Sequence, residues 1–156
     1  MIVEVVKRRD VIRNLLKTAR GVAVQIDPSF QSVISGYLAV MSAGFIEQSI
    51  CQILMEYARR RGDRKLQNFV SKTEERENSL NCEKIQRILD RFDKDWWKNL
   101  SRELSYEEKS AVDILKTIRD QVSHGLTNGT GLSQIDIYFK HACSFIKKVE
   151  TEVLGS

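Results

Sequence analysis

The chain has 156 residues, of which 42% are hydrophobic and 29% charged, and its formal net charge is +4. This length and composition fit one folded domain over residues 1–156 and exclude a fibrous or intrinsically disordered chain. The three cysteines, Cys51, Cys82 and Cys143, lie far apart and outside any CxxC spacing, which argues against a disulfide framework. With only two histidines besides, we expect no structural metal and no cofactor.

Two N-terminal segments bear on the location of the protein. The charges at residues 7–9 follow too short an apolar run for a signal peptide. Residues 28–46 carry no charge, but serines and Gln31 interrupt this stretch and Glu47 ends it. We therefore expect a buried amphipathic helix rather than a membrane span, and a cytoplasmic protein with reduced thiols.

Two helices are predicted in the first part of the chain. Apolar residues at three- and four-residue spacing predict a helix over residues 2–19 that ends at Gly21. Asp27 and Pro28 are typical of a helix start, and no breaker follows before Gly62, so a long central helix is predicted. Its small residues predict a tight helix pair, for which a subunit interface is one location: Gly36, Ala39, Ser42, Ala43 and Gly44.

The middle of the chain combines charged stretches with short apolar patterns. Residues 63–78 have few core candidates and predict a short peripheral helix followed by a surface loop. Helical spacing returns over residues 81–92. We expect Trp96 and Trp97, which follow, to pack in the core rather than to stack on a nucleotide.

The last third of the chain predicts two longer helices. Ser105 and Glu108 form a capping box that opens a helix, and Gly125 ends it. After a loop with three glycines, Ser133 with Asp136 starts the last helix. Because no strand alternation or internal repeat is evident, the predicted fold class is all-α, an up-and-down bundle of four to six helices.

The segment from Arg119 to His124 is the main candidate for chemistry. On an ideal helix these two residues lie about 140° apart, so a shared pocket requires His124 to leave the helical path next to Gly125. Histidine can exchange protons near neutral pH. The residues alone leave open the alternative that His124 is a helix C-terminal cap with no catalytic role.

Glu47 and Arg119 are predicted to form an ion pair. The helical neighbours of Glu47 at three and four residues are nearly all apolar or small. Arg119 continues the apolar stripe of the helix that ends at Gly125. Because burying either charge alone is costly, pairing the two is the economical hypothesis.

This arrangement resembles the HEPN superfamily, in particular its RiboL-PSP-like branch, over residues 28–154. The likeness rests on a long uncharged helix with an embedded acidic residue, an R-x4-H segment followed by glycine, and a final amphipathic helix. Asp120 stands where asparagine is frequent in that motif. The resemblance implies a metal-independent endoribonuclease, usually a homodimer in which two R-x4-H segments face one another and form one composite site.

The resemblance also implies residue roles. Arg119 would neutralise phosphate charge in the transition state, and His124 would transfer protons while the 2′-hydroxyl of the RNA attacks its own phosphate. Asp120 and Glu47 would orient these two residues. The products would carry a 2′,3′-cyclic phosphate and a 5′-hydroxyl. Such ribonucleases occur in toxin–antitoxin, phage-defence and RNA-processing systems, so an antitoxin or another regulatory protein is a candidate partner besides RNA.

Other interpretations remain open. The chain is alternatively a non-catalytic HEPN-like module that binds a nucleotide, an RNA or a partner protein and uses Arg119 and His124 structurally. A plain helical adaptor would be favoured if Glu47 and Arg119 lay far apart on solvent faces. The basic residues at 59–61 and 64–65 could guide an RNA backbone, but a solvated helix end is the preferred interpretation.

Overall fold

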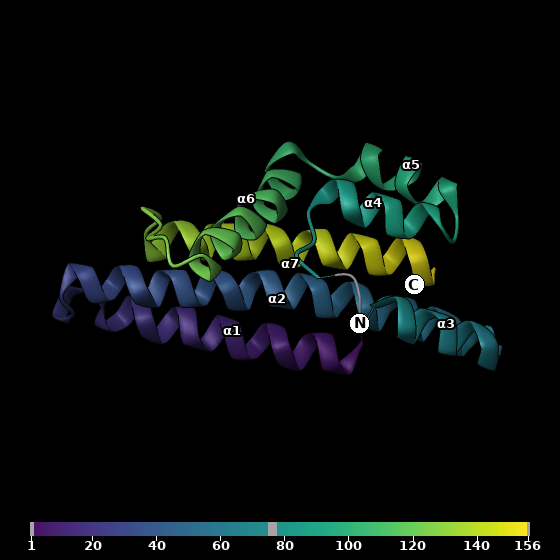
Figure 1. Cartoon of the computed structure of the whole chain (residues 1–156), viewed down its shortest axis with the longest axis horizontal. Helices are drawn as coiled ribbons and strands as arrows, with labels where there is room; N and C mark the ends of the chain where they lie inside the picture. Colours follow the sequence, from purple (N-terminus) through teal and green to yellow (C-terminus); the bar gives the residue numbers. More distant parts are fainter. Residues whose placement is uncertain (1, 75–77, 156) are drawn as a thin grey trace.

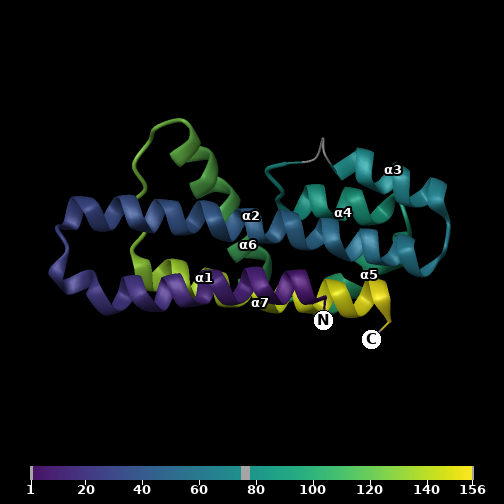
Figure 2. The same cartoon turned by 90° about the horizontal axis from the view of Figure 1, so that it is seen from below.

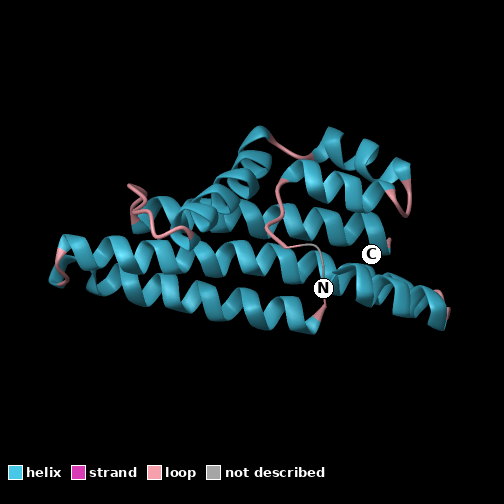
Figure 3. Cartoon of the chain, in the orientation of Figure 1, coloured by secondary structure: helices cyan, strands magenta, loops and turns pink. Residues whose placement is uncertain are grey.

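The computed structural model describes residues 2–74 and 78–155, which form seven α-helices and one 3-10 helix (Figure 1). The all-α class is confirmed, and the described residues form no strand (Figure 3). The number of helices exceeds the predicted four to six. The turn at 91–93 separates the helix predicted over residues 81–92 from a further short helix over residues 94–103, and each of the two begins at its own side-chain cap.

The first two helices form an antiparallel hairpin (Figure 2). Helix α1 (Val3–Val22) runs through Gly21, one residue past the predicted end, and a 3-10 turn, η1 (Ala23–Gln25), follows it. Helix α2 (Pro28–Arg60) has the predicted boundaries, and the carboxylate of Asp27 caps it by accepting a hydrogen bond from the Ser29 amide at 2.9 Å. The long helix was thus predictable from its cap and its lack of breakers.

Helix α2 is the centre of the bundle and packs against α1, α3, α6 and α7. Its small residues permit the close approach that the sequence predicted, here within one chain. A Cβ on Gly36 would lie 3.2 Å from side-chain atoms of both Val122 and Asn128, so α2 contacts the end of α6 closely at this point. Among the described helices, α2 alone is long and apolar enough to cross a membrane, and 56% of its most apolar window is buried inside the protein.

Three short helices cover one end of the bundle: α3 (Arg64–Glu74), α4 (Cys82–Asp90) and α5 (Lys94–Glu103). Side chains of Asn81 and Asp93 cap the last two. Trp96 is buried, as predicted, with its ring 4.9 Å from that of Tyr57, whereas Trp97 is only partly buried. Part of the surface loop predicted before residue 78 lies outside the described residues.

Helices α6 (Tyr106–Ser123) and α7 (Leu132–Leu154) complete the core with α2. The predicted capping box of Ser105 and Glu108 is present, with reciprocal bonds of 3.1 and 2.8 Å. Helix α7 begins one residue before Ser133, with Gly131 at the N-cap position. The role predicted for Asp136 at this helix start was wrong, because its carboxylate instead pairs with Arg20 of α1 at 2.6 Å.

Gly125 ends α6 as predicted, in a left-handed conformation with φ of +72°. The amides of Gly125 and Leu126 donate to the carbonyls of Val122 and Gln121 at 3.0 and 2.9 Å, which is the Schellman pattern. We expect Gly125→Ala to lower the unfolding free energy by about 1 kcal/mol, because an added Cβ meets no neighbour and only the positive φ is penalised. Urea unfolding measures this loss. The control is Gly129→Ala, where no positive φ applies, and equal losses in both variants would contradict the assignment.

Candidate functional site

Glu47 of α2 and Arg119 of α6 form the predicted ion pair. Nη1 of Arg119 donates to Oε1 of Glu47 at 2.6 Å, and the two side chains are 24% and 15% exposed. The pair lies where the apolar faces of the two helices meet, so each charge neutralises the other in a partly desolvated position. The observation that would have favoured a plain helical adaptor, wide separation of these residues, is therefore contradicted.

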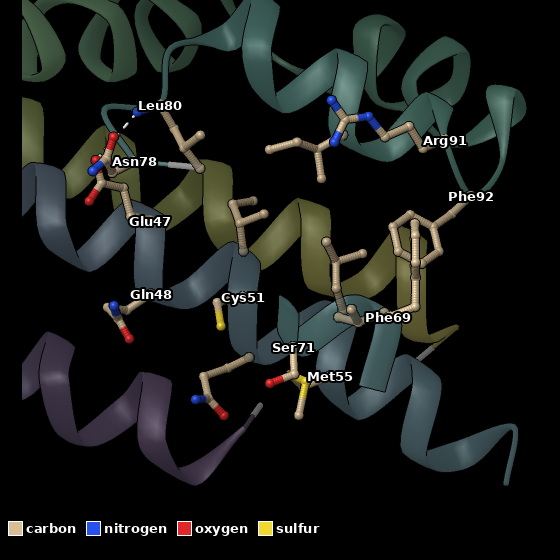
Figure 4. A pocket seen from close by; sticks show the side chains of 15 residues that line it. Glu47, Gln48, Cys51, Met55, Phe69, Ser71, Asn78, Leu80, Arg91 and Phe92 are labelled. Atoms are coloured by element: carbon tan, nitrogen blue, oxygen red, sulfur yellow. Dashed lines mark hydrogen bonds between the residues drawn. The ribbon is translucent and has the colours of Figure 1, made fainter. Parts of the chain in front are cut away.

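The segment before α4 adds further hydrogen bonds to this pair. The backbone amide of Ser79 donates to Oε1 of Glu47. The amide of Leu80 donates to the same oxygen at 3.4 Å (Figure 4). Ser79 adopts φ of +60°, which is unusual for a residue with a side chain. Its hydroxyl donates to Oδ1 of Asp120 at 2.7 Å. Ser79 thus joins the two acidic residues that the sequence singled out, and no motif pointed to it.

Among the described residues, the carboxylate of Asp120 forms no hydrogen bond or ion pair with the side chain of Arg119 or His124. Its carboxylate pairs with Lys116, one turn earlier on α6, and accepts the hydrogen bond from Ser79. The hydrogen bond from Lys116, followed by that from Ser79, lowers the pKa of Asp120 below its usual value. Asp120 is linked to the Glu47–Arg119 pair by the hydrogen bond from Ser79, and the charge of Arg119 also acts on its carboxylate, so it supports the segment before α4.

His124 is the C-cap residue of α6 and its side chain is exposed. Its amide donates to the carbonyl of Asp120 at 3.1 Å. His124 thus occupies the C-terminal cap of α6, the position named in the alternative interpretation of the sequence. In the part of the chain that the structure describes, no hydrogen bond or ion pair joins its imidazole to Arg119 or Glu47. One chain therefore brings Glu47, Arg119 and Asp120 together and leaves His124 on the surface at the end of the same helix.

A cavity of about 400 Å³ lies beside this cluster, between α2, α3 and α4 (Figure 4). Glu47 lines one end of it, and most of the wall is apolar, including Met55, Phe69 and Phe92. Neither Arg119 nor His124 lines this cavity. Because neither residue lines it, the cavity is not where the arginine and the histidine would meet a substrate.

Neither of the two cysteines with a shifted pKa, Cys82 and Cys143, is an activated nucleophile. Burial, followed by the nearby charge of Asp113, raises the pKa of the Cys82 thiol to about 12. Burial likewise raises the pKa of Cys143 to about 11. Since the thiolate is the reactive form, both groups are inert near neutral pH. In the described ranges, no three His, Cys, Asp or Glu side chains gather as a metal site would require.

The structure is an all-helical module in which an ion pair joins α2 to α6. The family model RiboL-PSP-HEPN matches residues 4–154, and the chain belongs to this family. Neither a search of curated proteins nor a search of solved structures gave a match. The matched range begins in α1, so the family likeness includes the first helix, which the sequence-based resemblance over residues 28–154 left out.

Proposed function

We propose that the protein is a metal-independent endoribonuclease that acts as a homodimer, with Arg119 and His124 of both subunits in one composite site. One observation carries this proposal: a carboxylate holds the arginine of the R-x4-H segment, and the histidine of the same segment is exposed. The arginine is thereby positioned in advance, and the histidine is free to meet a second copy of the chain. This function belongs to a class in which positioned charges and proton transfer perform the chemistry.

In the proposed reaction, the 2′-oxygen of a ribose forms a bond to the adjacent phosphorus while the bond from phosphorus to the 5′-oxygen breaks. The imidazole of one His124 takes the proton of the 2′-hydroxyl, and the imidazolium of the partner's His124 gives a proton to the leaving 5′-oxygen. Arg119 compensates the charge on the non-bridging oxygens. Its bond to Glu47 uses Nη1, and the guanidinium has further N–H donors for a phosphate.

Exposed apolar side chains on α2 and just after His124 support the dimer. Phe30, Val33 and Tyr37 of α2 are 59%, 65% and 60% exposed. They belong to the same stretch of α2 that contacts the end of α6 through Gly36. Leu126, two residues after His124, is also exposed. Clustered apolar side chains on a surface are typical of interfaces, so a second copy docked here would cover the end of α6.

A second candidate function, a non-catalytic module that binds RNA, a nucleotide or a partner protein, has its own observation. The charge of Arg119 is already compensated by Glu47, and among the described residues the imidazole of His124 forms no hydrogen bond or ion pair with Glu47, Arg119 or Asp120. The same arrangement is expected if Glu47 and Arg119 form a purely structural ion pair and His124 is only a helix cap. Under this alternative the protein binds its ligand and leaves RNA intact.

Cleavage of single-stranded and folded RNAs in the presence of EDTA tests the proposal. We expect the protein to cleave, to leave 5′-hydroxyl ends that polynucleotide kinase can phosphorylate, and to lose roughly 10²- to 10⁴-fold in rate on His124→Ala. His141→Ala, which removes the other histidine, is the matched control and should cleave normally. Equal cleavage by His124→Ala and the parent would reject the assignment. Binding without cleavage by the parent would favour the non-catalytic module.

The biological setting follows from the same proposal. A cytoplasmic ribonuclease of this kind would act as a toxin, a defence effector or a processing enzyme, and an antitoxin or regulatory protein would hold it in check. Expression of the parent protein, but not of His124→Ala, would then slow the growth of a host cell. Equal growth with both would argue against a toxin and leave the ribonuclease proposal to the cleavage assay.

A further inference from the structure

Helix α1 carries the whole net charge of the protein. Within Val3–Val22 there are six Lys and Arg residues and two acidic residues, which gives +4, and the formal charge of the entire chain is also +4. The remaining residues therefore sum to zero. A charge excess confined to one helix on the surface indicates a polyanionic partner more specifically than the overall pI does.

The positive charges of α1 meet those of α7 in a shallow depression on the surface. A hollow of about 490 Å³ is lined by four basic side chains, one carboxylate and one glycine: Arg13, Lys17, Arg20, Lys140, Asp136 and Gly21. Arg13 and Lys17 are one turn apart on α1, and a Cβ at Gly21 would meet no atom within 4 Å, so this end of the depression is open.

The single carboxylate of this depression pairs with two of the four basic residues and leaves the other two without a close counter-ion. Asp136 lies at the base, where its Oδ2 contacts Arg20 at 2.6 Å and Lys140 at 3.1 Å. Arg13 has only a long contact of 3.5 Å to Asp10 and is 57% exposed. Within the described chain, no carboxylate lies within ion-pair distance of Lys17. The lining thus keeps an excess of positive charge, with Arg13 and Lys17 directed to solvent.

The basic residues at the end of α2, Arg59, Arg60 and Arg61, differ from Arg13 and Lys17 because each has a close partner. Arg59 and Arg60 share the carboxylate of Glu56 at 2.7 and 2.9 Å, and Arg61 lies over the ring of Tyr57. These two hydrogen bonds lower the pKa of Glu56 to about 2, so it stays ionised at neutral pH. All three arginines of this run have a close partner, whereas Arg13 and Lys17 do not, so the run is a weaker phosphate site than the depression between α1 and α7.

We propose that the depression formed by α1 and α7 binds backbone phosphates of RNA and holds the substrate at a place separate from the R-x4-H segment. This inference rests on the proposed ribonuclease function. The end of α6 and the hairpin partner α1 lie on opposite sides of α2 (Figure 2), so the two sites contact different parts of a strand. Arg13 and Lys17 contact phosphates, and Asp136 positions Arg20 and Lys140 beside them.

RNA binding by a double variant tests this inference. We compare Arg13→Gln/Lys17→Gln with Lys98→Gln/Arg102→Gln, a control on α5 that also removes two exposed charges one turn apart. Both are made in His124→Ala, so that cleavage does not interfere, and the probe is a fluorescently labelled single-stranded RNA of mixed sequence. Losing two phosphate contacts should make the negative slope of log K, the association constant, against log salt shallower by about 1.4. At ~0.1 M salt the affinity should fall about 25-fold. The control should bind as its parent does.

The outcomes separate this inference from the proposed function. Equal binding by the two double variants, or no RNA binding by their parent, would overturn the depression as a phosphate site, whatever the cleavage assay shows. Binding through Arg13 and Lys17 by a protein that never cleaves would support the depression and reject the ribonuclease. Displacement of the RNA by inorganic phosphate, but not by chloride at the same ionic strength, would instead assign a site for free phosphate.

Discussion

Replacing Glu47 with alanine should lower the unfolding free energy by about 3 kcal/mol, as measured by urea denaturation. Removing one partner of a buried ion pair typically costs 3–5 kcal/mol, and the partial exposure of this pair places it at the lower end. The change leaves the Arg119 guanidinium without its counter-ion and removes the acceptor of the Ser79 and Leu80 amides. The loss therefore combines an uncompensated charge with unsatisfied backbone donors.

Two further variants separate these contributions. Glu47→Gln keeps an oxygen acceptor for the amides and removes the charge, so it should be less damaging than Glu47→Ala. In the double variant Glu47→Ala/Arg119→Ala no charge remains unpaired, and its loss should be smaller than the sum of the two single losses. Strict additivity would show that the two side chains are not coupled and would contradict the pair.

Replacing Arg119 with alanine should reduce RNA cleavage by roughly 10²- to 10³-fold, the usual effect of removing one donor that stabilises transition-state charge. The same change should cost less stability than Glu47→Ala. Glu47 keeps the amides of Ser79 and Leu80 as donors when the arginine is absent, so the carboxylate is not left unsatisfied. Cleavage rates under single-turnover conditions and urea unfolding of the same preparations give the two quantities.

Arg119→Lys is the informative companion variant. A lysine keeps the positive charge but not the planar, bidentate donor geometry, so it should retain the ion pair with Glu47 better than it retains cleavage. A stable Arg119→Lys protein with low activity would support contact between the guanidinium and phosphate. Full activity of Arg119→Ala in a folded dimer would instead exclude Arg119 from the reaction.

Much of the fold was predictable because local signals agree with tertiary packing. The Asp27–Pro28 start, the capping box at Ser105 and the stop at Gly125 each act within a few residues, and the structure confirms all three. The role of Asp136 was misjudged because a carboxylate near a helix start resembles a cap. Its ion pair with Arg20, 116 residues away, overrides that local preference.

The site was predictable only in part. A carboxylate and an arginine on apolar helix faces imply a pair, and Glu47 and Arg119 form one. Ser79 was missed because its role depends on a left-handed backbone and on two partners distant in sequence. Neither property can be recognised from the local sequence around Ser79. The position of His124 relative to a second copy depends on an interface, so the composite site stays a prediction.

The bond from Arg119 to Glu47 spans 72 residues of chain, and that from Ser79 to Asp120 spans 41. Contacts between residues so far apart form only after the intervening loops have closed, which is entropically costly and slow. The orientation of the arginine is therefore a property of the assembled bundle and not of α6 alone. An isolated peptide of α6 would retain the R-x4-H sequence and some helicity, but without Glu47 its Arg119 side chain would have no fixed orientation.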